Sequence, residues 1–302
     1  KRKFFDYPIR PFNALQGLGF FEAARCMISY AGERLLPTRD TSTFEGWVTS
    51  RFGKRLYNIF FKTYSEKLWG IPCTGLDSDF AAQRIKKLSL LEALRNAFSL
   101  GGRNRHATLV DQFAYPTGGT GSIYESMQET VESRGGQILV NTGVRRVITK
   151  NGKAHSLELE NGETRKYDHI ISSMPISLLV ERLPEVPEPV VALSRSLKFR
   201  NTILVYLRVE QTELFTDQWL YVHEKSLQMG RVTNFRNWIP QIYGDSGSTI
   251  LCLEYWCYFE DRLWNLAHDE LVSLAKDEIS DTGLVEREDI REGHVEKLPR
   301  CY

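Results

Sequence analysis

The spacing of apolar residues changes along this chain, and that change restricts its fold more than any other feature does. In the first hundred residues, apolar side chains recur at steps of three and four, which is typical of amphipathic helices. Farther on, short β-rich stretches are separated by Asn151-Gly152 and Asn161-Gly162, and Asn-Gly is a strong hairpin signal. Long alternating segments fill the last third. Helices, then an antiparallel β-meander, then a larger mixed sheet with helices predict an α+β fold.

The N-terminal helices are expected at three places in the sequence. They cover Ala14–Tyr30, Phe44–Phe60 and Phe80–Phe98. The second helix follows a capping box, Ser42–Glu45, in which the Ser and Glu side chains satisfy each other's backbone donors. The segment Trp69-Gly70-Ile71-Pro72 is expected to end this helical stretch.

The middle of the chain is expected to form a meander after a helix. The loop Tyr115–Gly121 leads into a second capping box, Ser122–Glu125, and a helix that Gly135-Gly136 ends. A further helix is expected over Asp269–Ile279, and Leu183–Pro189 is expected to be a linker. The expected strands are Gln137–Val140, Val144–Thr149, Ala154–Glu160, Tyr167–Ser172, Thr202–Glu210, Arg231–Trp238 and Ser248–Tyr258.

Length and composition exclude several classes of protein. The 302 residues suggest about two domains, and we expect three segments: a helical region over 1–110, the meander over 111–185 and the sheet with helices over 186–302. A net charge of +1 gives no overall footprint for nucleic acid. The longest apolar runs are far shorter than the ~20 residues of a membrane span. Five cysteines without a C-x-x-C pair indicate a reducing, cytoplasmic setting, and the scattered histidines suggest no metal.

Two local patterns are candidates for ligand binding. Gly119-Thr120-Gly121 opens a helix whose free N–H groups could hold an anion, although a tight turn into a helix would have the same sequence. In Phe60–Gly70, aromatic and basic residues alternate near a helix end, an arrangement suited to stacking a planar base and neutralising a phosphate. Tyr64 and Trp69 are the stacking candidates, and the alternative is that these rings belong to the core.

The same segments resemble known families. Tyr64–Gly70 (YSEKLWG) resembles the Y-T-x-K-Q-W-G segment of UDP-galactopyranose mutases. Phe113–Ser122, Arg134-Gly135-Gly136 and Val140–Val147 are similar to the F-x-Y-P-x-G-G-x-G, R-G-G and N-T-x-V blocks of flavin amine oxidases and protoporphyrinogen-oxidase-like proteins. Asp168–Pro175 (DHIISSMP) resembles the strand that follows there.

The resemblance implies FAD as cofactor. It places the loop with Gly118 and Gly119 and the backbone of Val144 at the cofactor, with Val144 at the adenine. Residues Ser172, Ser173, Met174 and Pro175 then pass beside the dinucleotide. In the mutases, the tyrosine stacks on uracil and the tryptophan lies near the sugar. The resemblance therefore gives Tyr64, Trp69 and Arg84 as substrate-binding residues, with Arg84 at the diphosphate.

The resemblance also assigns roles to the three segments. Residues 1–110 become a substrate or cap region, 111–185 part of the FAD domain, and 186–302 the substrate-domain sheet. The family begins with a strand–GxGxxG–helix unit that this sequence lacks. We therefore expect the interior of a two-domain FAD-linked α/β flavoprotein with the N-terminal Rossmann unit missing, and FAD is expected of the full-length protein.

Three functional hypotheses follow from the sequence. The first is an FAD-dependent oxidoreductase or UDP-sugar mutase-like protein of cell-surface polysaccharide biosynthesis, acting on a small molecule such as a nucleotide sugar. The second is a non-catalytic binding or scaffold protein that has lost FAD binding. The third, a nucleotide-sugar glycosyltransferase, is disfavoured because the sequence has no D-x-D motif. The first hypothesis puts the chemistry on the flavin, so no catalytic side chain is assigned.

Overall fold

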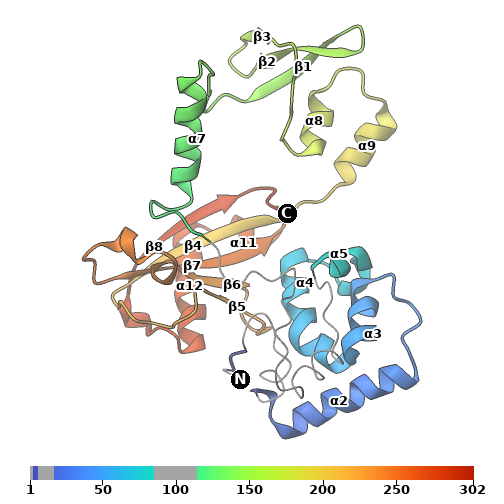
Figure 1. Ribbon diagram of the computed structural model, residues 1–302, viewed down its shortest axis with the longest axis vertical. Coiled ribbons are helices and arrows are strands. Elements are labelled where there is room, and N and C mark those ends of the chain that lie inside the picture. Colours follow the sequence, from blue (N-terminus) through green and yellow to red (C-terminus); the bar gives the residue numbers. More distant parts are fainter. Residues whose placement is uncertain (1–2, 6–16, 85–113) are drawn as a thin grey trace. The chain divides into compact units, whose positions relative to one another are not determined.

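The computed structural model describes residues 3–5, 17–84 and 114–302 (Figure 1). These residues form two compact units. Unit 1 contains the described residues up to Thr117 together with Arg200–Leu298, and unit 2 contains Gly118–Phe199 with Pro299–Tyr302. Unit 1 is therefore assembled from two separate parts of the sequence, and the larger part of unit 2 lies between them along the chain.

The N-terminal part of unit 1 is helical, as the sequence predicts. The apolar stripe expected over Phe44–Phe60 is buried, and Val48 at its centre is fully inaccessible. The helical run ends at Gly70, which has a left-handed conformation. The helices are α2 (Phe20–Leu35), α3 (Phe44–Tyr57), a π-helical stretch (Asn58–Lys62), α4 (Thr63–Trp69), a short 3₁₀ turn (Cys73–Gly75) and α5 (Ser78–Arg84). Most of the range Phe80–Phe98, where a helix is expected, lies outside the described residues, and so does the start of the range expected to be helical from Ala14.

The predicted position of the first helix cap is wrong by one residue. Helix α3 is capped by Thr43, whose hydroxyl accepts a hydrogen bond from the Gly46 amide at 3.1 Å. Ser42 instead bonds the Asp40 carboxylate through its own amide and hydroxyl, at 2.9 and 2.6 Å. Asp40 closes this local turn because a short acidic side chain can bond the backbone two residues on, and the turn removes Ser42 from the cap position.

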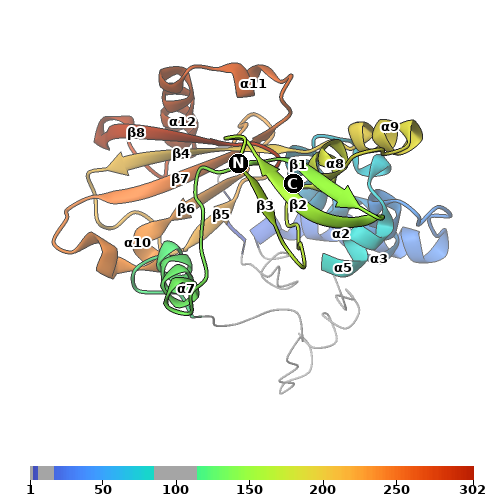
Figure 2. The same cartoon turned by 90° about the horizontal axis from the view of Figure 1, so that it is seen from above.

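The C-terminal part of unit 1 is a five-stranded antiparallel sheet. Its spatial order is β5-β6-β7-β4-β8, so the two long expected strands, β4 and β7, lie side by side at its centre. Helix α12 (His268–Thr282) packs against β4 and β8 and buries Leu271, Ala275 and Ile279 (Figure 2). The strands are β4 (Asn201–Val209), β5 (Trp219–Tyr221), β6 (Arg231–Asn234), β7 (Thr249–Cys257) and β8 (Ile290–Leu298).

The expected strand over Arg231–Trp238 is only half right. It ends at Asn234, whose side chain accepts hydrogen bonds from the amides of Arg236 and Asn237. This cap starts the short helix α10 (Phe235–Trp238) in place of further strand. A second short helix, α11 (Arg262–Asn265), follows β7.

Unit 2 contains the expected meander. Its three strands pair antiparallel in the order β1-β2-β3, and the turns between them fall at the two Asn-Gly dipeptides. The elements are α7 (Gly121–Ser133), β1 (Val144–Lys150), β2 (Lys153–Leu159), β3 (Thr164–Lys166), α8 (Ile176–Arg182) and α9 (Glu188–Ser196). The expected linker Leu183–Pro189 lies inside this unit, where residues 183–187 connect α8 to α9 and Glu188 and Pro189 begin α9.

Three local predictions in unit 2 are wrong. Gln137–Val140 and Tyr167–Ser172 are not strands. The Tyr167 amide donates to the His155 carbonyl of β2 at 3.1 Å, but the strand β3 itself ends at Lys166. The apolar side chains of both segments stay accessible, and Ile171 is 97% exposed. The second capping box also fails. Helix α7 starts at Gly121, and the Ser122 hydroxyl donates back to the Gly119 carbonyl at 2.8 Å.

No described helix combines the length and the apolar character needed to cross a bilayer. The α+β class predicted from the sequence is confirmed by the helices and antiparallel sheets of the two units.

Candidate functional site

Tyr64 lies on α4 at the centre of an aromatic cluster in unit 1. Its ring meets the Tyr221 ring edge-on at 5.1 Å and the Trp256 ring edge-on at 5.7 Å between centroids. The His223 ring lies tilted against it at 5.5 Å. Tyr221 belongs to β5, His223 follows that strand, and Trp256 belongs to β7. We define these four residues as the Tyr64 cluster. Tyr64 itself is of intermediate exposure.

Sequence reasoning did not find the other three residues of the Tyr64 cluster. The sequence did contain a signal for strands near these residues, because each lies in or beside a segment of alternating apolar residues. Their meeting with Tyr64 depends on the order of strands in the sheet, which the alternation of residues does not reveal.

Lys67 holds α4 to the loop after β5. Its ammonium donates to the carbonyls of Val222, Glu224 and Met229 at 3.0, 2.6 and 3.1 Å. Burial lowers the Lys67 pKa to about 8. The three carbonyls use the three donors of an ammonium group. Lys67 therefore acts as a tether and is not free to neutralise a phosphate.

A buried carboxylate lies close to this tether. Glu278 of α12 accepts a hydrogen bond from the Met229 amide at 2.9 Å, and burial raises the Glu278 pKa. Beside the same loop, burial and the nearby Lys67 charge lower the His223 pKa to about 4. His223 is therefore neutral at pH 7, and its Nδ1 is buried without a partner among the described residues.

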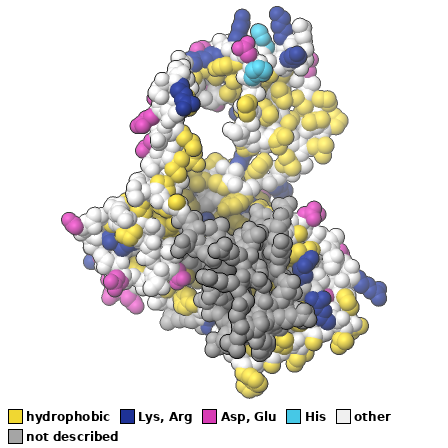
Figure 3. Space-filling view, viewed as in Figure 1, with side chains coloured by type: hydrophobic (Ala, Val, Ile, Leu, Met, Phe, Trp, Pro, Cys, Tyr) yellow, Lys and Arg dark blue, Asp and Glu magenta, His cyan; other side chains and the backbone are white. Residues whose placement is uncertain are grey.

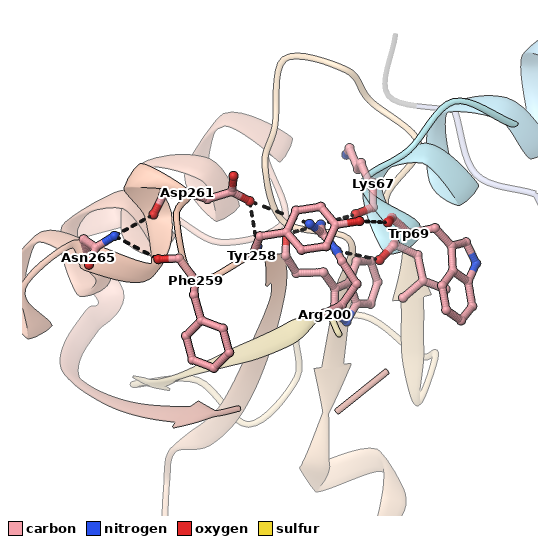
Figure 4. Close-up of polar contacts among 9 residues, drawn as sticks. Lys67, Trp69, Arg200, Tyr258, Phe259, Asp261 and Asn265 are labelled. Carbon is pink, nitrogen blue, oxygen red and sulfur yellow. Dashed lines mark hydrogen bonds and ion pairs between the residues drawn. The ribbon is translucent and has the colours of Figure 1, made fainter. Parts of the chain in front are cut away.

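Arg200 fixes the C-terminal end of α4 (Figure 4). Its guanidinium donates to the carbonyls of Leu68 at 3.1 Å and Lys67 at 3.0 Å, and to that of Trp256 on β7 at 2.6 Å. The last carbonyls of a helix lack partners within the helix and carry partial negative charge, so a buried cation there satisfies both needs. Arg200 thereby holds the helix that carries Tyr64 against the strand that carries Trp256.

Tyr258 completes this arrangement. Its ring lies under the Arg200 guanidinium at 4.3 Å, and its hydroxyl donates to the Trp69 carbonyl at 2.9 Å. Asp261 pairs with the same guanidinium at 3.6 Å. The Arg200 and Tyr258 side chains leave no space for a side chain at Gly70, where a Cβ atom would lie 2.4 Å from Arg200 and 2.7 Å from Tyr258.

The two other predicted substrate residues do not join the Tyr64 cluster in the described contacts. The Trp69 ring packs edge-on against Phe80 at 4.5 Å and lies against the helical core. Arg84 is the last residue of α5, and its side chain lies outside the described part of the structure. Substrate binding by Tyr64, Trp69 and Arg84 remains a prediction.

The predicted cofactor residues all belong to unit 2. Gly118 and Gly119 precede α7, and Gly119 has a φ of 83°, a conformation that glycine adopts readily. Val144 begins β1. The remaining four, Ser172, Ser173, Met174 and Pro175, connect the meander to α8.

Three of these positions are accessible from the surface. Gly118, Ser172 and Ser173 are exposed. The resemblance assigns the Val144 backbone to adenine, and the carbonyl of that backbone accepts a 2.6 Å hydrogen bond from Arg182. A carbonyl has two lone pairs, so it can accept a second donor. The accessible backbone at these positions is compatible with FAD, and binding at them remains a prediction.

Two surface hollows of the described residues do not include the predicted site residues. One of about 440 Å³ is lined by Gln137, Leu139, Arg165, Lys166 and Tyr167, and contains none of the predicted site residues. Within the described ranges, no group of three or more His, Cys, Asp or Glu side chains could hold a metal ion.

Comparison with known families agrees with this architecture. The family model described as flavin containing amine oxidoreductase matches residues 29–291. The chain therefore belongs to the flavin-containing amine oxidoreductase family, and the resemblance seen in the sequence is confirmed.

Solved structures of several enzymes share the fold. Reduced UDP-galactopyranose mutase superposes with a TM-score of 0.78 at 21% identity, covering 95% of this chain and 61% of the mutase. An Exiguobacterium sp. 255-15 protein assigned as a protoporphyrinogen oxidase superposes with a TM-score of 0.67 at 17% identity, covering 94% of this chain and 61% of that protein. A putrescine oxidase variant superposes with a TM-score of 0.57 at 13% identity, covering 98% of this chain and 62% of the oxidase. The chain thus spans about three fifths of the length of these relatives.

Proposed function

We propose that this chain is the substrate-binding and partial FAD-binding portion of an FAD-dependent enzyme that acts on a nucleotide sugar. The observation that carries the proposal is the Tyr64 cluster, because Tyr64 occupies the motif position of the base-stacking tyrosine and is held there from three directions. The fold shared with UDP-galactopyranose mutase supports it. A role in cell-surface polysaccharide biosynthesis belongs to the same proposal.

The residues of unit 1 would bind and orient the substrate. A base stacked on Tyr64 would gain about 1–3 kcal/mol, which is usual for stacking on an aromatic side chain. Neutral His223 adds no charge beside the base at pH 7, since its pKa is about 4. Arg200 and Lys67 act indirectly, by fixing α4 against the sheet and so setting the position of Tyr64.

Unit 2 would contribute part of the cofactor site. Gly118, Gly119, Val144 and Ser172–Pro175 are the residues that would hold FAD. When bound, the flavin would supply either hydride acceptance from a substrate carbon or covalent stabilisation of a sugar during ring contraction. The choice between redox and mutase chemistry is open within the proposal, since both use the same substrate-positioning residues.

The direct test is titration of the full chain with UDP, followed by isothermal calorimetry. Tyr64→Leu should weaken UDP binding by roughly 5- to 150-fold, the range that 1–3 kcal/mol of stacking implies. Tyr124→Leu is the matched control, because Tyr124 lies on α7 and is 68% exposed. Absence of UDP binding by the unchanged chain, or equal affinities in a folded Tyr64→Leu variant, would refute the nucleotide-sugar proposal.

A visible absorption spectrum of the longest natural form of the protein distinguishes the enzyme from the non-catalytic scaffold protein. Flavin absorption that co-purifies with that form supports the enzyme. A colourless protein that still binds UDP supports a non-catalytic binding protein.

A further inference from the structure

The side of α2 that faces away from the core is apolar. Phe20, Ala24, Ile28, Ala31 and Leu35 follow one another at steps of four, four, three and four, so they form one stripe along a helix. The exposed side chains in and beside this stripe are Phe20 (83%), Phe21 (81%), Ile28 (73%), Leu35 (81%) and Leu36 (84%). Figure 3 shows hydrophobic side chains at the surface along the lower edge, where α2 runs. We call these residues the α2 stripe.

The rotation of α2 is fixed by its opposite face. Cys26 and Tyr30 are buried there. Gly53 of α3 lies so close that a Cβ atom on it would be 2.9 Å from the Tyr30 amide nitrogen. The Arg55 amide also donates to the Ser29 hydroxyl at 3.1 Å. Because these contacts hold the buried face in place, the helix cannot turn the α2 stripe inward.

Arginines border the α2 stripe on both sides. Helical geometry places Arg25 along one edge and Arg34 along the other. The Arg25 side chain is 67% exposed and pairs with the Glu22 carboxylate at 3.5 Å. Glu22 also pairs with Arg55, so two arginines share one carboxylate on this side of the helix. On the other side, Arg34 donates to the Tyr30 hydroxyl at 2.9 Å, and because that partner is neutral the arginine charge is not balanced by it. Glu33 accepts a hydrogen bond from the Thr38 amide. Taken together, these three arginines and two carboxylates leave a net positive charge beside the stripe.

We propose that α2 binds flat on the surface of an anionic lipid bilayer. The α2 stripe would enter the boundary between headgroups and acyl chains, and Arg25 and Arg34 would contact lipid phosphates from its two edges. The helix has 16 residues, so it is about 24 Å long and too short to span a bilayer with its charges. The proposal does not depend on the substrate or cofactor of the protein.

The charge pattern favours lipid over a second copy of this chain. A twofold contact through the α2 stripe would bring the same arginine edges near one another, and like charges oppose association. Lipid phosphates are complementary to both edges at once.

Co-sedimentation with vesicles tests the proposal on the full chain. Binding to vesicles of phosphatidylcholine with one quarter phosphatidylglycerol should exceed binding to pure phosphatidylcholine several-fold, and should fall as salt is raised. Ile28→Ser/Leu35→Ser should reduce binding at least tenfold. Leu193→Ser on α9, where Leu193 is 68% exposed, is the matched control and should bind as the unchanged chain does.

A second variant tests the charges independently. Arg25→Glu keeps the α2 stripe intact and should remove the preference for anionic vesicles, with circular dichroism confirming the fold. Failure of the unchanged chain to bind either vesicle, or equal binding by the folded Ile28→Ser/Leu35→Ser variant, would overturn the proposal. A concentration-dependent dimer that this variant abolishes, without vesicle binding, would show that a second copy covers the stripe.

Discussion

Gly70 illustrates how one residue sets the geometry of the candidate site. It ends α4 in a left-handed conformation, with a φ of 68°. An added methyl group there would meet the Arg200 guanidinium and the Tyr258 ring. The residue is therefore constrained twice, by its backbone and by the close approach of two side chains that come from the sheet.

Gly70→Ala is expected to destabilise the protein by about 2–4 kcal/mol, because left-handed strain adds to displacement of the Arg200 contact. Gly135→Ala is the matched control. Gly135 also follows a helix with a positive φ of 82°, but open space surrounds the position of its Cβ. Gly135→Ala should therefore lower the free energy of unfolding by only about 1 kcal/mol. Urea unfolding measures both, and equal losses would contradict the role given to the Arg200 contact.

His223 gives a prediction about acid stability. Its pKa is about 4 in the folded protein, against an ordinary value of 6.5. As the pH falls from 6.5 toward 4, the unfolded chain takes up a proton that the folded protein refuses, so stability is lost across that window. The expected loss is on the order of 2–3 kcal/mol.

His223→Phe keeps a ring beside Tyr64 and removes the titration. Its free energy of unfolding should change less between pH 6.5 and 4.5 than that of the unchanged protein, as measured in urea at several pH values. Parallel pH profiles for the two proteins would show that the burial of His223 does not affect stability.

At the scale of elements, short contacts at the end of α4 decide where the candidate site forms. The helix has only seven residues, from Thr63 to Trp69, and would not be stable alone. Its last carbonyls are satisfied by Arg200 and by the Tyr258 hydroxyl, both from the sheet half of unit 1. The sheet therefore stabilises the helix that presents Tyr64 to it.

Arg200→Ala should lower the free energy of unfolding by about 3 kcal/mol, because three buried carbonyls lose a charged donor. Arg200→Lys should recover only part of this, since an ammonium lacks the planar fork that reaches separate acceptors. Denaturant unfolding provides the measurement. Full recovery by lysine would mean that charge alone matters, which would contradict the geometric argument.

At the scale of the molecule, the described residues of unit 1 form two hydrophobic cores. One is built from helical residues between Cys26 and Ala81, and the other from residues of the sheet and α12 between Ile203 and Ile290. Lys67 of the helical part donates to a carbonyl of the sheet part, and Arg200 of the sheet part donates to a carbonyl of α4. Arg200 also donates to the Trp256 carbonyl of β7. These polar contacts should couple the unfolding of the two cores.

Removing both tethers should uncouple the cores. In Lys67→Met/Arg200→Ala, amide hydrogen exchange should accelerate in α2 to α5 more than in β4 and β7, because the helical core has fewer long-range strand pairings to hold it. Mass spectrometry of peptic fragments resolves the two regions. Equal acceleration in both would show that other contacts couple them.

The sequence by itself determined the local elements of this protein. The stripe from Phe44 to Phe60, the Asn151-Gly152 turn and the long strands depend on side-chain spacing and on turn chemistry, which act between near neighbours. The family could also be identified from the sequence, because its motifs are contiguous. The capping errors at Ser42 and Ser122 are local too, and arise because several short polar side chains compete for the same backbone groups.

Only the tertiary structure decided the composition of the candidate site. Arg200 bonds Leu68 across 132 positions, and Tyr258 bonds Trp69 across 189. Such contacts depend on the order of strands β5-β6-β7-β4-β8 and on the return of the chain to unit 1 after residue 199. Local periodicity shows which faces of the strands are apolar, but it does not show which strands become neighbours. For that reason Tyr64 could be found from the sequence, and its partners Tyr221, His223 and Trp256 could not.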